Sequence, residues 1–144
     1  LVIINDRLDV ALASGAHGVH LGADDLPLAA ARKISPRGFI IGASVDTPDQ
    51  AREAESLGAD YLGAGPVFPT ETKTTSNPVI GPAGLEAIVK AVSIPVVGIG
   101  GIGPENIQEV MATGAAGAAV ASAVVLSPDP EDIVRALRSS AGSG

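Results

Sequence analysis

The 144-residue chain contains no cysteine, is 46% hydrophobic but only 2% aromatic, and carries 16 acidic against 9 basic residues, for a net charge of -7. This length and composition allow one compact domain with a core of small aliphatic side chains and no disulfides. The acidic balance and the scarcity of aromatic rings argue against a non-specific nucleic-acid binder. The absence of a run of about 18 apolar residues argues against a membrane span.

The expected elements alternate strands with helices. Continuously apolar or small-residue runs, typical of strands buried on both faces, predict strands at 1–4, 18–21, 39–43, 61–63, 94–99 and 118–125. Helical spacing predicts helices at 6–14, 26–34, 47–57, 84–92, 104–113 and 130–138, with 139–144 as a frayed tail. Repeated strand–helix units predict a parallel sheet, open or closed.

The ends of the helices support this reading. Thr47-Pro48-Asp49 offers an N-cap, a proline at the first helical position and an acid in the first turn. Gly15-Ala16, Gly58-Ala59 and Gly114-Ala115 each stand between a helix and the next strand. The recurrence of this joint indicates one repeated βα unit.

Small residues after the last two strands favour a closed barrel over an open nucleotide-binding sheet. The run from Gly98 to Gly101 lacks the third glycine of a GxGxxG turn. The exits of these two strands hold Gly98, Gly100, Gly101, Ala119, Ala121 and Ser122. With the dipole of a helix expected from Pro104, they match the phosphate site of (β/α)8 barrels. Tight helix–sheet packing, which also needs glycine, is the alternative.

Polar residues follow the earlier strands. Asn5 and Asp6 follow the first strand, Asp24 and Asp25 the second, and Ser44 the third. In a parallel sheet these residues meet on one rim, where two carboxylates beside phosphate groups suit Mg²⁺. A helix N-cap at Asp6 and a capped loop at Asp24-Asp25 are the alternatives.

The loop after the fourth strand carries the densest polar chemistry. Gly63 to Thr75 includes Thr70, Glu71, Thr72 and Lys73 after two prolines. Hydroxyls, free backbone N–H groups and one lysine charge are suited to orienting an anion. An ordinary polar surface loop is an equal alternative. His20, inside the second strand, is interpreted as a packed or rim histidine and not as a ligand, and no GxSxG nucleophile motif is present.

Six ordered blocks of this sequence resemble the thiamine-phosphate synthase family. The resemblance covers nearly the whole chain and includes the Pro-Thr-x-Thr-Lys loop. The blocks are Ile3 to Arg7, Gly18 to Gly22 with Asp25 following, Gly42 to Ser44, Gly65 to Lys73, Gly98 to Ile102, and Ala121 to Ala123.

The resemblance implies a (β/α)8 TIM barrel and a transferase that joins 4-amino-2-methyl-5-hydroxymethylpyrimidine diphosphate to a thiazole phosphate, with release of pyrophosphate. Mg²⁺ held by Asp6 and Asp25 would stabilise the leaving diphosphate. The residues implied to contact the pyrimidine substrate are Asn5, Ser44 and Lys73, and Ser44 and Lys73 are the implied catalytic residues. Those implied to hold the thiazole phosphate are Thr70, Glu71, Thr72, Gly101, Ala121 and Ser122.

The sequence departs from the family in some places. About six βα units are present, no Gln-Leu-Arg-Glu-Lys block exists, and Leu1 opens a strand at once. We therefore expect residues 1–144 to form one domain that lacks the first two units of the barrel and is poorly active alone. Ala23-Asp24 replaces the Gln-Glu of many relatives. Asp46 stands where thiazole tautomerases use a histidine, which counts against that activity.

Two alternatives to the synthase stay open, a tautomerase and a non-catalytic binder of phosphate ligands. The expected partners are small molecules, without nucleic acid or membrane, in the cytoplasm. The sequence leaves open whether the protein forms a homo-oligomer.

Overall fold

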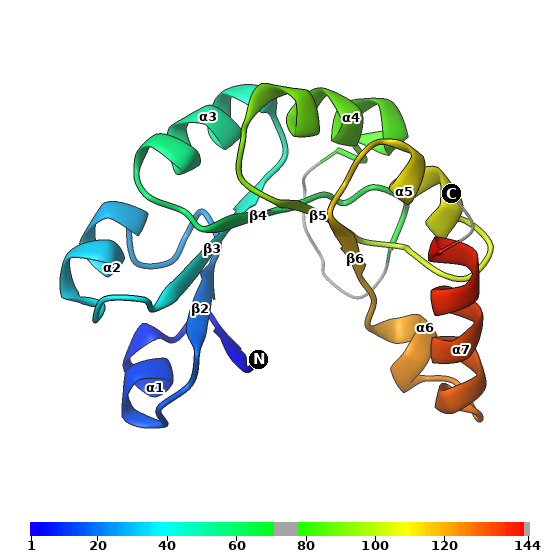
Figure 1. Cartoon of the computed structure of the whole chain (residues 1–144), viewed down its shortest axis with the longest axis horizontal. Coiled ribbons are helices and arrows are strands. Elements are labelled where there is room, and N and C mark those ends of the chain that lie inside the picture. The colour runs from blue at the N-terminus through cyan, green and yellow to red at the C-terminus, as the bar shows by residue number, and fades with distance from the viewer. Residues whose placement is uncertain (71–77, 143–144) are drawn as a thin grey trace.

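The computed structural model describes residues 1–70 and 78–142, which form one curved sheet with its helices (Figure 1). The strands are β1 (Ile3–Asn5), β2 (Gly18–Leu21), β3 (Ile40–Val45), β4 (Tyr61–Ala64), β5 (Val96–Ile99) and β6 (Gly117–Ala119). The helices are α1 (Leu8–Ala13), α2 (Leu28–Ile34), α3 (Pro48–Ser56), α4 (Gly81–Ala91), α5 (Ile107–Ala112), α6 (Ser122–Val125) and α7 (Pro130–Ala141).

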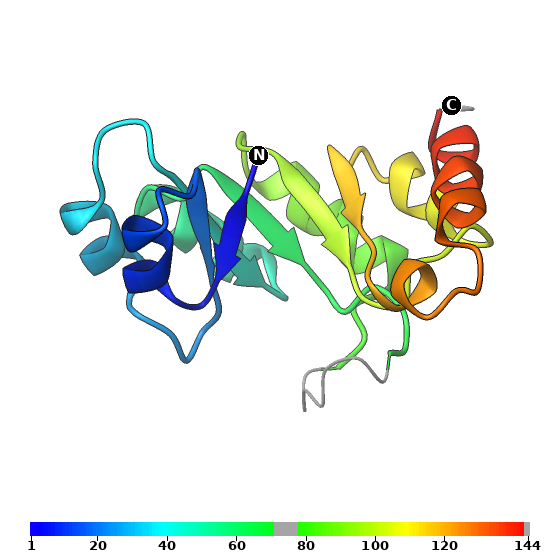
Figure 2. The same cartoon turned by 90° about the horizontal axis from the view of Figure 1, so that it is seen from below.

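All neighbouring strands are parallel, in the order β1-β2-β3-β4-β5-β6. The register aligns Asn5 with His20, His20 with Gly42, and Gly42 with Tyr61. Because every strand runs the same way, the carboxyl ends of the strands lie along one edge of the sheet (Figure 2). The fold is therefore an open, partial barrel of the TIM type, as predicted.

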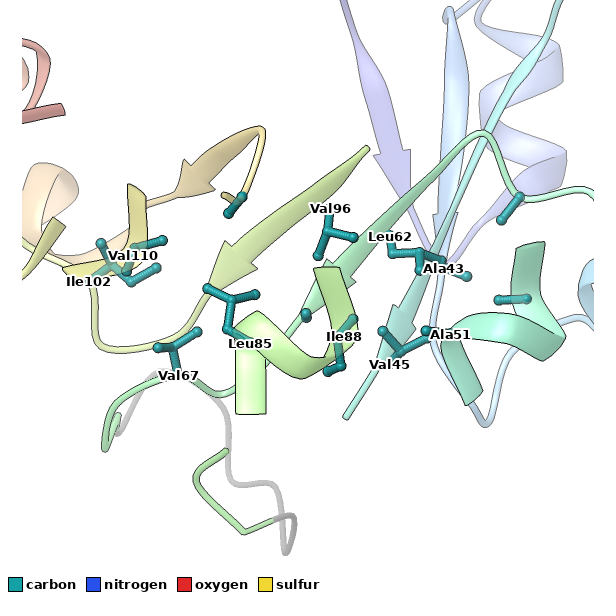
Figure 3. Packing of buried hydrophobic residues seen from close by; sticks show 14 of the residues in the cluster. Ala43, Val45, Ala51, Leu62, Val67, Leu85, Ile88, Val96, Ile102 and Val110 are labelled. Carbon is teal, nitrogen blue, oxygen red and sulfur yellow. The ribbon is translucent and has the colours of Figure 1, made fainter. Parts of the chain in front are cut away.

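The main helices lie on the convex side of the sheet (Figure 1) and cover its apolar residues. Leu62 of β4 and Leu85 and Ile88 of α4 are fully buried. They belong to a cluster that continues across α3 and α5 (Figure 3). Burial of each such side chain stabilises the fold by roughly 1.5–3 kcal/mol. Among the described residues, none of the helices is both long and apolar enough to cross a membrane.

The opposite, concave face of the sheet carries a different set of side chains. Successive residues of a strand point to opposite faces. In β3, Ala43 and Val45 are buried in the helix-covered core, whereas Ser44 between them is exposed. His20 and Tyr61, which align with Gly42 between them, are half-buried. Polar chemistry on this sheet is therefore confined to the concave face and the rim.

The predicted joints and cap are confirmed. Gly15, Gly58 and Gly114 have φ angles of 67°, 91° and 84°, a backbone region that costs glycine little. The residues that follow two of them close the helix ends: Ala16 N donates to Ala11 O and Ala59 N to Ala54 O, each at 3.0 Å. Thr47 Oγ1 accepts from Gln50 N at 3.3 Å, which caps α3.

The end of the chain differs from the prediction. The strand predicted over 118–125 was wrong beyond Ala119, because β6 ends there and Ser122–Val125 form the short helix α6. A short apolar run does not by itself distinguish strand from helix. The helix expected from Pro104 begins only at Ile107. Residues 139–141, predicted as part of a frayed tail, extend α7 to Ala141.

Candidate active site

The rim of the sheet begins at the end of β1, where the first predicted metal ligand lies. Asn5 is the last residue of β1 and is exposed. Asp6 follows with a φ of 63°, and its N–H donates to His20 O at 2.8 Å. This bond fixes the Asp6 backbone against β2, so Asp6 sits at the carboxyl ends of two neighbouring strands.

Asp25 closes the loop that follows β2. Its Oδ2 accepts from Gly22 N at 2.7 Å, and its N–H donates to Gly22 O at 3.3 Å. The capped-loop alternative therefore describes Asp25 correctly. This bond is compatible with the predicted magnesium role, because a carboxylate has two oxygens and about four acceptor positions.

A hydrogen-bonded cluster of three side chains joins β2, β3 and β4 on the concave face. His20 Nδ1 lies 2.9 Å from Tyr61 Oη, and His20 Nε2 lies 2.9 Å from Ser44 Oγ. The rings of His20 and Tyr61 are tilted, with centroids 5.4 Å apart. Burial raises the pKa of the Tyr61 hydroxyl above its usual value of 10.0, so this group keeps its proton.

Two glycines provide the space for the rings of this cluster. A Cβ on Gly42 would overlap the Tyr61 ring, and a Cβ on Gly63 would lie 2.9 Å from His20 Cε1. Both glycines align with cluster residues across the sheet: Gly42 pairs with His20 and Tyr61, and Gly63 pairs with Ser44. The backbone of β3 and β4 is thus adapted to these rings.

The glycines after β5 serve two purposes. A Cβ on Gly98 would lie 2.8 Å from Val110 Cγ1 in the helix layer, so this residue fits the packing alternative. Gly100 and Gly101 instead have φ angles of 96° and 63°. A Cβ on Gly101 would lie 2.5 Å from Pro69 O. These two glycines allow the loop after β4 to approach the loop after β5.

Backbone hydrogen bonds join these two loops. Val67 N donates to Ile99 O at 2.9 Å, and Phe68 N donates to Gly100 O at 3.1 Å. Asn106 then braces the glycine turn, because its Oδ1 accepts from Gly103 N and its Nδ2 donates to Gly101 O, both at 2.9 Å. The beginning of the Pro-Thr-x-Thr-Lys loop is therefore held against Gly101.

The structure places most of the predicted substrate residues on this rim. Gly101 and Ala121 each lie two residues beyond the paired residues Ile99 and Ala119. Half-buried Thr70 follows Pro69, which contacts the Gly101 turn. Ser122 is the first residue of α6. The remaining predicted site residues lie outside the described part of the chain: Glu71, Thr72 and Lys73.

No group of three or more histidine, cysteine or acidic side chains that could hold a metal occurs among the residues the structure describes. The predicted pair of aspartates still has the hard oxygen donors that Mg²⁺ prefers, and Mg²⁺ often takes only one or two protein carboxylates.

Sequence reasoning gave His20 little weight and missed Tyr61 as a site residue. The signal that could have found them is the period of two on the strands. In Gly18-Val19-His20-Leu21, the histidine alternates with two buried aliphatic residues. A polar ring at such a position faces away from the helix-covered core, and parallel alignment then sets it beside Ser44.

Comparison with known proteins places this chain in a family. Residues 1–124 match the family described as thiamine monophosphate synthase. The thiamine-phosphate synthase of Methanospirillum hungatei is 58% identical over 127 residues, which cover 88% of this chain and 62% of that protein. The enzyme of the same name from Haloquadratum walsbyi is 53% identical over 140 residues, covering 96% of this chain and 63% of that protein.

A solved structure of the same enzyme class resembles this chain as well. Thiamine phosphate pyrophosphorylase from Pyrococcus furiosus superposes with a TM-score of 0.89 at 50% identity, covering 98% of this chain and 67% of that one. The chain spans less than two thirds of the length of the two curated relatives. The match over residues 1–124, together with these relatives, establishes that this chain belongs to the thiamine monophosphate synthase family.

Proposed function

We propose that the protein couples 4-amino-2-methyl-5-hydroxymethylpyrimidine diphosphate to a thiazole phosphate, giving thiamine phosphate and pyrophosphate. Membership of the family supports this activity, and both curated relatives cited carry the synthase name. The observation that supports the roles of individual residues is their arrangement: Asp6, Asp25 and Gly101 follow strands on one rim, and Ser44 lies on the adjoining concave face. In this proposal residues 1–144 act as one synthase-like domain on small-molecule substrates.

Asp6 and Asp25 are the proposed ligands of Mg²⁺, at the carboxyl ends of β1 and β2. Bound there, Mg²⁺ would neutralise charge on the leaving diphosphate. The proposal is supported by the backbone of Asp6, which is hydrogen-bonded to the end of β2, and by the closed loop of Asp25 after the same strand. The chemistry needs no protein nucleophile, because the thiazole nitrogen attacks the pyrimidine methylene as pyrophosphate leaves.

The two substrates would divide the rim between them. Asn5, Ser44 and Lys73 are proposed to contact the pyrimidine diphosphate. The thiazole phosphate is proposed to lie at the joined loops after β4, β5 and β6, with contacts from Thr70, Glu71, Thr72, Gly101, Ala121 and Ser122. Hydroxyls and backbone N–H groups at close-approach glycines are suited to phosphate oxygens.

The test is pyrophosphate release from the two substrates with Mg²⁺ present, measured with the full-length protein. Asp25→Ala and Lys73→Ala are each expected to lower kcat/KM by at least about a hundredfold, the scale of removing an electrostatic contact to a developing anion. Lys33→Ala, at an exposed position in the last turn of α2, is the matched control for Lys73→Ala. Full turnover in both site variants would overturn the site assignment.

The tautomerase and the non-catalytic alternatives draw no support from the relatives cited. The same experiment separates them from the synthase. A tautomerase would convert its thiazole substrate without releasing pyrophosphate, and a non-catalytic binder would show heat of ligand binding by calorimetry without turnover.

A further inference from the structure

The His20 ring lies between two hydroxyl groups, and its tautomer decides what each hydroxyl can do. Both contacts are 2.9 Å, from Nδ1 to Tyr61 Oη and from Nε2 to Ser44 Oγ. A neutral imidazole has one N–H donor and one acceptor nitrogen. One hydroxyl must therefore donate to the ring, and the other must accept from it.

The chemistry of the two hydroxyls favours one arrangement. A phenol hydroxyl is far more acidic than an aliphatic hydroxyl, so it is the better donor and the poorer acceptor. Tyr61 is also half-buried beside the ring, whereas Ser44 is exposed on the concave face. Tyr61 donation to Nδ1 leaves the ring proton on Nε2, where it donates to Ser44 Oγ. The Ser44 hydrogen then remains available for another partner.

We propose that Tyr61 holds His20 in the Nε2–H tautomer, and that His20 thereby positions the Ser44 hydroxyl as a hydrogen-bond donor toward an acceptor atom of the substrate bound at the concave face. His20 and Tyr61 are positioning residues in this account, because they act through Ser44. The identity of that substrate as the pyrimidine diphosphate rests on the proposed function. Its ring nitrogens are acceptors of the required kind.

The close fit of the cluster supports a positioning role over loose packing. Gly42 and Gly63 leave no room for a Cβ beside the Tyr61 and His20 rings, so neither ring can shift toward the sheet. The bond from Asp6 N to His20 O fixes the histidine backbone at the same point. A ring held on these sides keeps both nitrogens directed at their hydroxyl partners.

The tautomer can be read directly by ¹⁵N NMR of histidine-labelled protein at a pH where both rings are neutral. The chain contains two histidines. His17 is an internal reference, since its Nδ1 accepts from Val2 N at 2.9 Å, and a backbone amide can only donate. We expect His20 to match the Nε2–H pattern of His17, and Tyr61→Phe to convert it to a mixture. An Nδ1–H pattern in the unaltered protein, or no change in Tyr61→Phe, would overturn the proposal.

Kinetics test whether the tautomer acts through Ser44. Tyr61→Phe is expected to raise KM for the pyrimidine diphosphate about fivefold, the size of one neutral hydrogen bond, and to leave KM for the thiazole phosphate unaltered. In a Ser44→Ala background, Tyr61→Phe should cause no further rise in KM for the pyrimidine diphosphate.

Two variants of His20 test the role of the ring. His20→Gln, which keeps one donor and one acceptor, should retain more affinity for the pyrimidine diphosphate than His20→Leu. Equal losses of affinity in His20→Gln and His20→Leu would contradict the positioning role of His20. Additive effects of Tyr61→Phe and Ser44→Ala on KM would contradict it as well.

NMR and kinetics together distinguish a failure of the positioning role from a failure of the proposed reaction. Absence of pyrophosphate release in the unaltered protein would reject the proposed reaction while leaving the NMR result to decide the tautomer. A confirmed reaction with the Nδ1–H tautomer would reject the positioning role alone.

Discussion

The concave face formed by β2–β4 and the rim after β4–β6 use glycine in different ways. In the first region, Gly42 makes room for the Tyr61 ring, and the polar groups are side chains such as those of Ser44 and His20. In the second, Gly100 and Gly101 make room for the backbone of residues 66–69, and the connecting groups are peptide N–H and C=O. The first region can discriminate between atoms of a ligand, and the second provides a stiff backbone surface for an anion.

Glycines at the end of a strand can therefore have different structural roles. Gly98, in the same block as Gly100, packs against Val110 and contributes to the core. The role of each glycine depends on which group a Cβ at its position would contact: a helix, an aromatic ring or another loop. The following experiments test this division, in order of expected effect.

The largest expected effect comes from Gly101→Ala. At a φ of 63°, an alanine there is strained, and its Cβ would also lie 2.5 Å from Pro69 O. We expect a loss of about 3 kcal/mol in the free energy of unfolding, measured by urea denaturation. Gly15→Ala is the matched control, since its φ is 67° but no atom lies within 4 Å of its Cβ position. That control should lose about 1 kcal/mol. Equal losses would show that the loop contact is not close.

Gly42→Ala tests the first region. Its Cβ would displace the Tyr61 ring, so we expect a loss of about 2 kcal/mol, measured by thermal unfolding. In a Tyr61→Ala background the same change should cost much less, because the ring is gone. Gly117→Ala, with nothing within 4 Å of its Cβ position, is the control. A penalty independent of Tyr61 would contradict the role given to Gly42.

Asn106 gives a smaller effect in the second region. Asn106→Ala removes the bonds to Gly103 N and Gly101 O, and we expect a loss of about 1–2 kcal/mol. Asn106→Asp keeps the acceptor for Gly103 N and loses the donor to Gly101 O, so its loss should be intermediate when the pH is neutral. The measurement is the urea midpoint at constant slope. An Asp variant as damaging as the Ala variant would assign most of the stabilisation to the Gly101 contact.

The smallest effect concerns the exposed ion pair next to Asp6. Hydrogen bonding from Arg7, at 2.8 Å to Asp9 Oδ1, lowers the pKa of Asp9 from 3.8 to about 2. Because the folded pKa is depressed, the stabilisation is complete above about pH 4 and is lost as the pH falls toward 2. An NMR titration of the Asp9 carboxyl should show this midpoint, and Arg7→Gln should return it toward 3.8. A midpoint unchanged by Arg7→Gln would exclude the ion pair as the cause.

Much of the fold and part of the rim could be predicted from the sequence. The Gly-Ala joints and the Thr47 cap depend on neighbouring residues, so local patterns located these helix ends well. The boundary at residues 118–125 was wrong because alanine and valine suit either a strand or a helix, and only packing decides. The different roles of Gly98, which packs against a helix, and Gly101, which lets two loops approach, could not be predicted either. Glycine has no side chain whose chemistry indicates its neighbours.

The sequence by itself determined the parallel βα architecture, the family, and the residues that follow each strand, because these depend on order along the chain. The tertiary structure decided which of those residues meet. His20, Ser44 and Tyr61 come from three strands and are far apart in sequence, yet the parallel register brings them within hydrogen-bond distance on one face. The physical reason is that hydrogen bonding between neighbouring strands fixes which positions lie side by side, and no local pattern contains that alignment.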